Sequence, residues 1–86
     1  MTKDALHRIK RIDTLIQKRG TGTPVQLADK LGISERCLYK YLNLMKEFGA
    51  PIKFSNARQS YYYDEEGYFK ISFHFKKMNY EAQNVR

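Results

Sequence analysis

The chain has 86 residues, with 16 Lys or Arg against 9 Asp or Glu, so its formal net charge is +7. This length predicts one domain with a modest core and no separate ligand-sensing module, and the charge favours a polyanionic partner such as nucleic acid or an anionic membrane surface. No apolar run is long enough to span a membrane and the first ten residues lack the apolar core of a signal peptide, so we expect a cytoplasmic protein.

The first predicted element is an amphipathic helix from Asp4 to Lys18. Its apolar residues recur at spacings of three, three and four, which places them on one face: Leu6, Ile9, Ile12 and Ile16. Several basic residues lie between them, and a basic amphipathic helix can also lie on a membrane or bind a partner protein. We expect most of these charges to form a solvated outer face.

Two further helices joined by a tight turn are predicted next. Thr23 is a suitable cap for the first of them, with Pro24 at its first position, where a missing N–H costs little; a short strand at 21–24 is the alternative. Gly32 can take the positive φ that ends this helix, and Ser34 can cap the next one by accepting a bond from a free backbone N–H. This pattern is that of a helix-turn-helix.

The third predicted helix runs from Glu35 to Phe48 and ends at Gly49. Leu38, Leu42 and Met45 share an inward face at spacings of four and three. The residues left free on the outside, and so able to reach a partner, are Glu35, Arg36, Tyr39, Lys40 and Asn43.

The remainder of the chain is rich in aromatic and β-branched residues and predicts strands. Residues 52–54 and 61–63 flank a polar loop and indicate a hairpin. After a second turn at 64–67, residues 69–75 alternate apolar and polar side chains and predict one more strand. That strand either covers the domain's own core or forms a homodimer interface, because open strand edges invite pairing. The tail at 78–86 has no clear period and is disordered or a short helix, which leaves a single domain at 1–77.

The predicted fold class is therefore α+β: a three-helix core with a helix-turn-helix, a β-hairpin wing and one additional C-terminal strand. The chain to about residue 63 resembles the amino-terminal DNA-binding domain of bacterial DeoR-type, WYL-containing and biotin-operon repressors. The residues that carry the resemblance are the run 11–16, Leu27-Ala28 with 31–34, Tyr39-Lys40 and the step 49–52 into the wing. In that family a glycine usually precedes the tyrosine that opens the second wing strand, whereas this chain has Ser60, and members normally continue into an effector or oligomerisation domain.

The resemblance implies a sequence-specific duplex DNA-binding protein that regulates transcription. The helix 35–48 is then expected to enter the major groove, where Arg36 suits guanine, Asn43 suits adenine or backbone, and Tyr39 and Lys40 reach a base edge or a phosphate. Glu35 either accepts a bond from a cytosine amino group or caps its own helix.

Two further groups of residues are predicted to touch the DNA backbone. Ser34 and Thr23 lie at predicted helix amino termini, which suit phosphates. Asn56 and Arg58 lie at the predicted wing tip and either contact the minor groove or a flanking phosphate or remain in solvent.

The charge is unevenly distributed along the chain. Residues 1–20 hold six basic and two acidic side chains, residues 21–49 hold four and three, and residues 50–86 hold six and four. The predicted reading helix is therefore not strongly basic, so we expect a lone monomer to bind DNA with modest, salt-sensitive affinity. A two-fold dimer would place its half-sites about one helical turn apart, roughly 34 Å.

Two other classes of function remain open. A single-stranded nucleic-acid binder would stack bases on the aromatic strands, namely on Tyr61, Tyr62, Tyr63, Tyr68, Phe73 and Phe75. A winged-helix adaptor would instead bind another protein through the hairpin. An enzyme is not expected, because His7, His74 and Cys37 have no catalytic or zinc-ligand spacing and the acidic run 64–66 is typical of a solvated turn. We expect no cofactor, no metal and no membrane partner.

Overall fold

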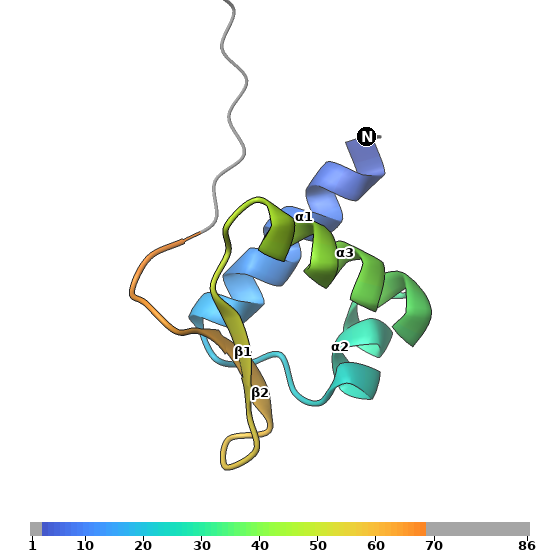
Figure 1. The fold of residues 1–86 in the computed structure, drawn as a ribbon. Coiled ribbons are helices and arrows are strands. Elements are labelled where there is room, and N and C mark those ends of the chain that lie inside the picture. The colour runs from blue at the N-terminus through green and yellow to red at the C-terminus, as the bar shows by residue number, and fades with distance from the viewer. Residues whose placement is uncertain (1–2, 69–86) are drawn as a thin grey trace, which may run out of the picture.

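The structure is a computed structural model that describes residues 3–68, so the predicted strand at 69–75 and the tail at 78–86 lie outside the described residues. The element order is α1 (Lys3–Gln17), α2 (Pro24–Leu31), α3 (Glu35–Glu47), β1 (Ile52–Ser55) and β2 (Ser60–Tyr63). The three helices pack together and the two strands form an antiparallel hairpin beside them (Figure 1). This confirms the predicted α+β winged helix-turn-helix.

The core lies where the three helices meet the first part of the hairpin. The predicted apolar stripe of α1 is buried at Ile9, Ile12 and Ile16, while Leu6 is only half-buried. The predicted inward face of α3 is buried as well. The full set of buried hydrophobic residues is Ile9, Ile12, Ile16, Leu27, Ala28, Leu31, Leu38, Leu42, Met45, Ala50, Ile52 and Tyr61.

The turn between α2 and α3 has the local chemistry that the sequence predicts. Gly32 ends α2 in the left-handed region at φ 70°, and its N–H donates to the carbonyl of Asp29 at 3.1 Å. The Ser34 hydroxyl accepts a bond from the Cys37 N–H at 3.1 Å and so caps α3. These two residues fix the angle at which α3 leaves the turn.

The start of α2 is capped by Thr23. Its hydroxyl accepts from the Gln26 N–H at 3.2 Å, and the Gln26 side chain accepts from the Thr23 N–H at 2.8 Å, which completes a capping box with Pro24 at the first helical position. The alternative of a short strand at 21–24 is wrong, because this segment has no strand in the structure.

Thr21 attaches that segment to the hairpin through side-chain hydrogen bonds. The Tyr61 N–H donates to the Thr21 hydroxyl at 2.8 Å, and the Thr21 N–H donates to the Ser60 hydroxyl at 3.1 Å. Thr21 and Ser60 are both fully buried, at 0% and 2% exposure. Ser60, the departure from the family's glycine, therefore has a structural reason, since its hydroxyl satisfies a buried backbone donor.

The hairpin is paired in register from Ile52 with Tyr63 to Ser55 with Ser60, and its loop covers residues 56–59. Gln59 takes a positive φ of 54°, and its side-chain amide donates to the Asn56 carbonyl at 2.7 Å. A left-handed residue at the end of a short loop lets the strands keep their twist. The wing is thus closed by Gln59 and needs no glycine there.

Candidate DNA interface

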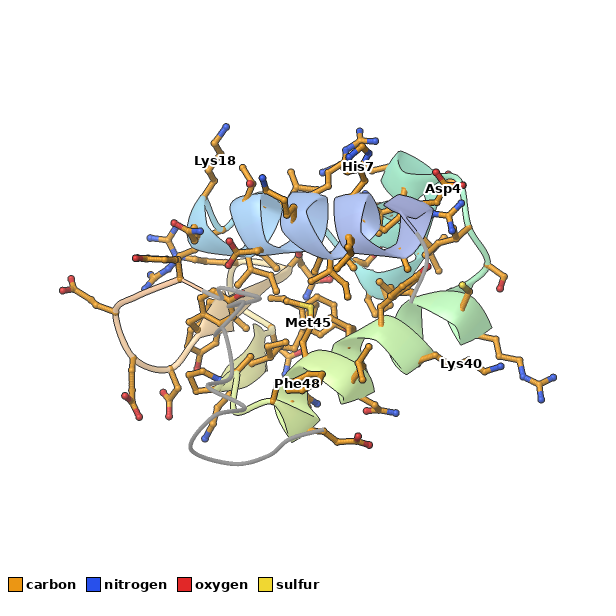
Figure 2. All side chains as sticks on the ribbon, turned by 90° about the horizontal axis from the view of Figure 1, so that it is seen from above. Asp4, His7, Lys18, Lys40, Met45 and Phe48 are labelled. Carbon is orange, nitrogen blue, oxygen red and sulfur yellow. The ribbon has the colours of Figure 1, made fainter. Side chains whose placement is uncertain are left out.

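The exposed face of α3 is the surface that the helix-turn-helix leaves available. All five residues predicted to face outward are exposed: Glu35, Arg36, Tyr39, Lys40 and Asn43. They lie opposite Leu38, Leu42 and Met45, which hold the helix on the core. Figure 2 shows Lys40 projecting from α3 into solvent, on the side away from α1. The prediction of which side chains face outward is confirmed.

The first turn of α3 borders the hairpin. Burial first, and then the Tyr39 phenol and the Glu35 carboxylate, raise the pKa of the Tyr61 phenol to about 12. Tyr61 also packs edge-on against Phe54, with ring centroids 5.0 Å apart. Glu35 and Tyr39 therefore lie on the wing side of the exposed face, and the carboxylate of Glu35 stands at the positive end of the helix dipole.

The two predicted phosphate ligands, Thr23 and Ser34, each use the hydroxyl oxygen to accept a bond from their own helix. A hydroxyl that accepts one hydrogen bond still has a proton to donate. Both residues lie at the amino end of a helix, α2 and α3 respectively. Their geometry is compatible with a phosphate contact.

The wing residues Asn56 and Arg58 lie in the exposed loop of the hairpin. The Arg58 N–H donates to the Ser55 hydroxyl at 3.1 Å, which orders the turn. In Figure 1 this loop is the tip of the hairpin and lies well away from α3. The structure therefore does not bring these two residues together with Arg36 and Lys40.

The polar contacts between α1 and the rest of the fold were not predicted from the sequence. The Tyr63 hydroxyl donates to the buried Asp13 carboxylate at 2.7 Å, and the Gln17 amide donates to its other oxygen at 2.8 Å. Arg8 donates to the Tyr41 hydroxyl at 3.2 Å, a bond that raises the pKa of Arg8 above its usual value. These partners are 33 or more residues apart, except for the local Gln17, so no periodic pattern signals them.

Two more cations are already committed to contacts within the fold. The Lys30 ammonium donates to the carbonyls of Gly20 and Thr21 at 2.7 and 3.3 Å. The Arg19 guanidinium lies over the Tyr62 ring, 5.6 Å from its centroid. Both cations therefore help to hold the segment after α1 in place.

The wing tyrosines do not form a platform for single-stranded nucleic acid. Tyr61 is 7% exposed in the core, and Tyr63 is half-buried with its hydroxyl on Asp13. Burial first, and then the bond to Asp13, raise the pKa of Tyr63, so this phenol keeps the proton that it donates. Base stacking needs exposed ring faces. Of the other tyrosines predicted to stack bases, Tyr62 is half-buried with Arg19 over its ring, and Tyr68 is 68% exposed.

The described part of the chain offers neither a cluster of metal-binding side chains nor a helix suited to span a membrane. Residues 3–68 contain no group of three or more His, Cys, Asp or Glu side chains placed to hold a metal ion. Over the same residues, no helix combines the length and the apolar character needed to cross a membrane.

Comparison with known families decides the class of this fold. The family profile described as "HTH domain" matches residues 7–64, from the first turns of α1 to the end of the wing. The chain belongs to the HTH domain family. It is thus a helix-turn-helix DNA-binding domain, and α3 is the second helix of its helix-turn-helix. Neither the search of curated proteins nor the search of solved structures finds a match to the chain.

Proposed function

We propose that this HTH domain binds double-stranded DNA with α3 in the major groove and regulates transcription. The observation that carries the proposal is the exposed face of α3, on which Arg36, Lys40 and Asn43 are exposed next to a helix-turn-helix corner fixed by Gly32 and Ser34. An α-helix fits the width of the major groove, and side chains of its first turns reach base edges. The resemblance to DeoR-type, WYL-containing and biotin-operon repressors supports a regulatory role in bacteria.

The residue types on α3 suit different contacts with the DNA. Arg36 lies in the first turn of the helix and is suited to bind guanine with two hydrogen bonds. Lys40 lies one turn further and is suited to a phosphate or a guanine, and Asn43 to adenine. Tyr39 and Glu35 lie nearer to Tyr61, so we assign them to the wing side of the contact, with Glu35 accepting from a cytosine amino group.

Phosphate contacts are assigned to the ends of helices and to the wing. Thr23 and Ser34 can each donate a hydroxyl proton to a phosphate while they cap α2 and α3. Asn56 and Arg58 are exposed at the tip of the hairpin, remote from α3, which favours a contact with flanking backbone or the neighbouring minor groove (Figure 1).

The charge of α3 argues for binding by two copies. Arg36, Lys40 and Lys46 are balanced in part by Glu35 and Glu47, so one helix neutralises few phosphates. We therefore propose a homodimer formed through the alternating apolar residues of 69–75. Its two α3 helices would enter major grooves about one helical turn apart, roughly 34 Å.

Fluorescence anisotropy of a short random-sequence duplex, measured across a salt series, tests the proposal. The parent protein is expected to bind more weakly as salt rises. Arg36→Ala with Lys40→Ala is expected to lose about tenfold or more in affinity at low salt and to reduce the salt slope by about two, because two cations no longer displace counterions. The matched control, Arg36→Lys with Lys40→Arg, keeps both charges and is expected to bind random duplex like the parent.

The same titration with single-stranded DNA separates the other classes of function. Equal duplex affinity in the parent and the alanine variant would remove α3 from the interface. A preference for the single strand would move the site to Tyr62 and Tyr68, and no binding to either strand form at low salt would favour a winged-helix adaptor that binds protein.

A further inference from the structure

The strongest concentration of positive charge on the domain does not lie on α3. Residues 1–20 contribute +4 of the +7 net charge, from six basic and two acidic side chains. On α1 and the residue after it, the exposed cations are Lys10, Arg11 and Lys18, with His7 on the same side. These four residues are called the basic face of α1.

The basic face results from the helical period of α1. With 3.6 residues per turn, positions 7, 10, 11 and 18 share the side opposite Ile9, Ile12 and Ile16, which are buried in the core. Of the two acidic residues of α1, Asp13 is buried and bonded to Tyr63, and Asp4 lies at the edge of the face. Lys10, Arg11 and Lys18 form no ion pair within residues 3–68.

The basic face points away from the exposed face of α3. Figure 2 shows His7 and Lys18 projecting from the side of α1 that is remote from α3, while Lys40 projects from α3 away from α1. Since both helices bury their other sides in one core, a straight duplex seated on α3 is out of reach of the basic face. Any ligand of the basic face is therefore a different molecule from the duplex that α3 binds.

The composition of this surface indicates the class of that ligand. Every exposed side chain of the described α1 residues is polar: Asp4, His7, Lys10, Arg11, Thr14 and Gln17, followed by Lys18. A helix that lies on a membrane needs an apolar side free for the lipid, but the apolar side of α1 is buried. Stable protein interfaces have an apolar or aromatic centre, which this surface lacks. Phosphates, in contrast, are contacted mainly by Lys, Arg and small hydroxyl residues.

We propose that the basic face of α1 binds the phosphate backbone of a second DNA duplex, without sequence preference, while α3 holds the first. Lys10 and Lys18 are eight residues apart, about 12 Å along the helix axis, which matches a row of several phosphate charges. One domain then bridges two DNA segments. The bridge rests on the proposed duplex binding by α3. The phosphate contact of the basic face follows from the charge of α1 and is independent of α3.

A capture experiment tests the bridge. One duplex is immobilised on beads, and a labelled second duplex is recovered only when protein joins the two. The parent is expected to recover the labelled duplex at low salt, and Lys10→Gln with Arg11→Gln and Lys18→Gln is expected to lower recovery about tenfold, because three phosphate contacts are lost. Glutamine is a good helix former at exposed positions, so the fold is expected to persist, which circular dichroism verifies.

Two control variants test whether a loss of recovery is due to the basic face of α1 and not to the net charge of the protein. Lys70→Gln with Lys76→Gln and Lys77→Gln removes the same charge from another part of the sequence and is expected to keep recovery within about twofold. Lys10→Arg with Arg11→Lys and Lys18→Arg keeps the charge of the face and is expected to bridge like the parent. Sedimentation of each variant shows whether the oligomeric state is unchanged, since a dimer can also join two duplexes through its two α3 helices.

The outcomes separate this proposal from the one for α3. Recovery by the α1 glutamine variant at the level of the parent, or no recovery by the parent at all, would overturn the bridge and leave duplex binding by α3 intact. An equal loss in the Lys70, Lys76 and Lys77 variant would show an effect of net charge and also overturn it. Anisotropy with one short duplex separates the two sites, because the affinity lost by Arg36→Ala with Lys40→Ala reports on α3, and the affinity that this variant loses further when Lys10, Arg11 and Lys18 are also replaced by Gln reports on the basic face.

Discussion

At the scale of single residues, buried polar contacts hold the wing on the helices. Asp13 is a nearly buried carboxylate that receives bonds from Gln17 and Tyr63, and Thr21 and Ser60 satisfy each other and the Tyr61 N–H. A buried donor or acceptor that loses its partner costs more free energy than an average hydrogen bond contributes. These residues therefore determine how firmly the hairpin is seated.

Substitution of Tyr63 by Phe measures one of these contacts. The change removes the hydroxyl that donates to Asp13 and keeps the ring, so we expect the free energy of unfolding to fall by about 2 kcal/mol, as for a hydrogen bond to a charged group. Urea unfolding followed by circular dichroism gives the value.

Tyr62→Phe is the matched control for that substitution, on the neighbouring residue of the same strand. Arg19 contacts the ring of Tyr62, which the change preserves, so we expect a loss within about 0.5 kcal/mol. Equal losses in the two variants would show that the bond to Asp13 contributes no more to stability than the Tyr62 hydroxyl does.

Most of these residue contacts could not be predicted from the sequence. The Asp13 and Tyr63 partners are 50 residues apart, and Thr21 and Ser60 are 39 apart. Periodicity and capping patterns report on neighbours within a few residues. In the sequence Ser60 is only a departure from a family pattern, and the structure supplies its reason in the bonds to Thr21.

At the scale of secondary-structure elements, the sequence was far more informative. The caps Thr23 and Ser34, the left-handed Gly32 and the inward residues of α3 all follow from local chemistry, and the structure confirms them. The third helix ends one residue earlier than predicted, at Glu47 with Phe48 as its cap, a difference of the size common at helix ends. The strand at 21–24 was wrong because Thr21 contacts the hairpin by side-chain bonds and not by a backbone ladder.

The αL turn at Gly32 gives a test at this scale. Gly32→Ala is expected to lower the free energy of unfolding by about 1 to 2 kcal/mol, because φ is 70° there and an L side chain disfavours that conformation. A Cβ at Gly32 would have no atom within 4 Å, so the cost is conformational and not steric. Thermal or urea unfolding measures it.

Gly20→Ala provides the comparison, because a Cβ there also has no atom within 4 Å and Gly20 is not among the glycines of positive φ. We expect that variant to remain within about 0.5 kcal/mol of the parent. A Gly32 variant as stable as the Gly20 variant would mean that the corner between α2 and α3 tolerates other conformations.

At the scale of the whole molecule, function depends on where the charges lie relative to the fold. The +7 net charge indicated a polyanionic partner, and membership of the HTH domain family agrees with DNA as that partner. The sequence also showed that the reading helix is weakly basic. The sequence could not show in which directions the two helix faces point. The structure places the basic face of α1 and the exposed face of α3 on different sides of one core (Figure 2).

The position of the wing relative to α3 could not be predicted from the sequence either. Asn56 and Arg58 were predicted at the tip of the hairpin and are exposed there, but their distance from α3 follows from how the hairpin is seated on α1. The sequence predicted for them a contact with the minor groove or a flanking phosphate, apart from the base contacts of α3, or a place in solvent. In the structure the wing residues and the exposed residues of α3 form two separate groups. A duplex that contacts both would bind α3 in a groove and the wing through flanking backbone.

The measurement that tests the central claim most directly is a map of amide chemical shifts in the isotope-labelled protein as one equivalent of duplex DNA is added. We expect the largest shifts in the first turns of α3, at residues 34–43, with smaller shifts at Thr23 and in the loop 56–59. Shifts confined to the hairpin, or absent from α3 at saturating duplex, would contradict the account.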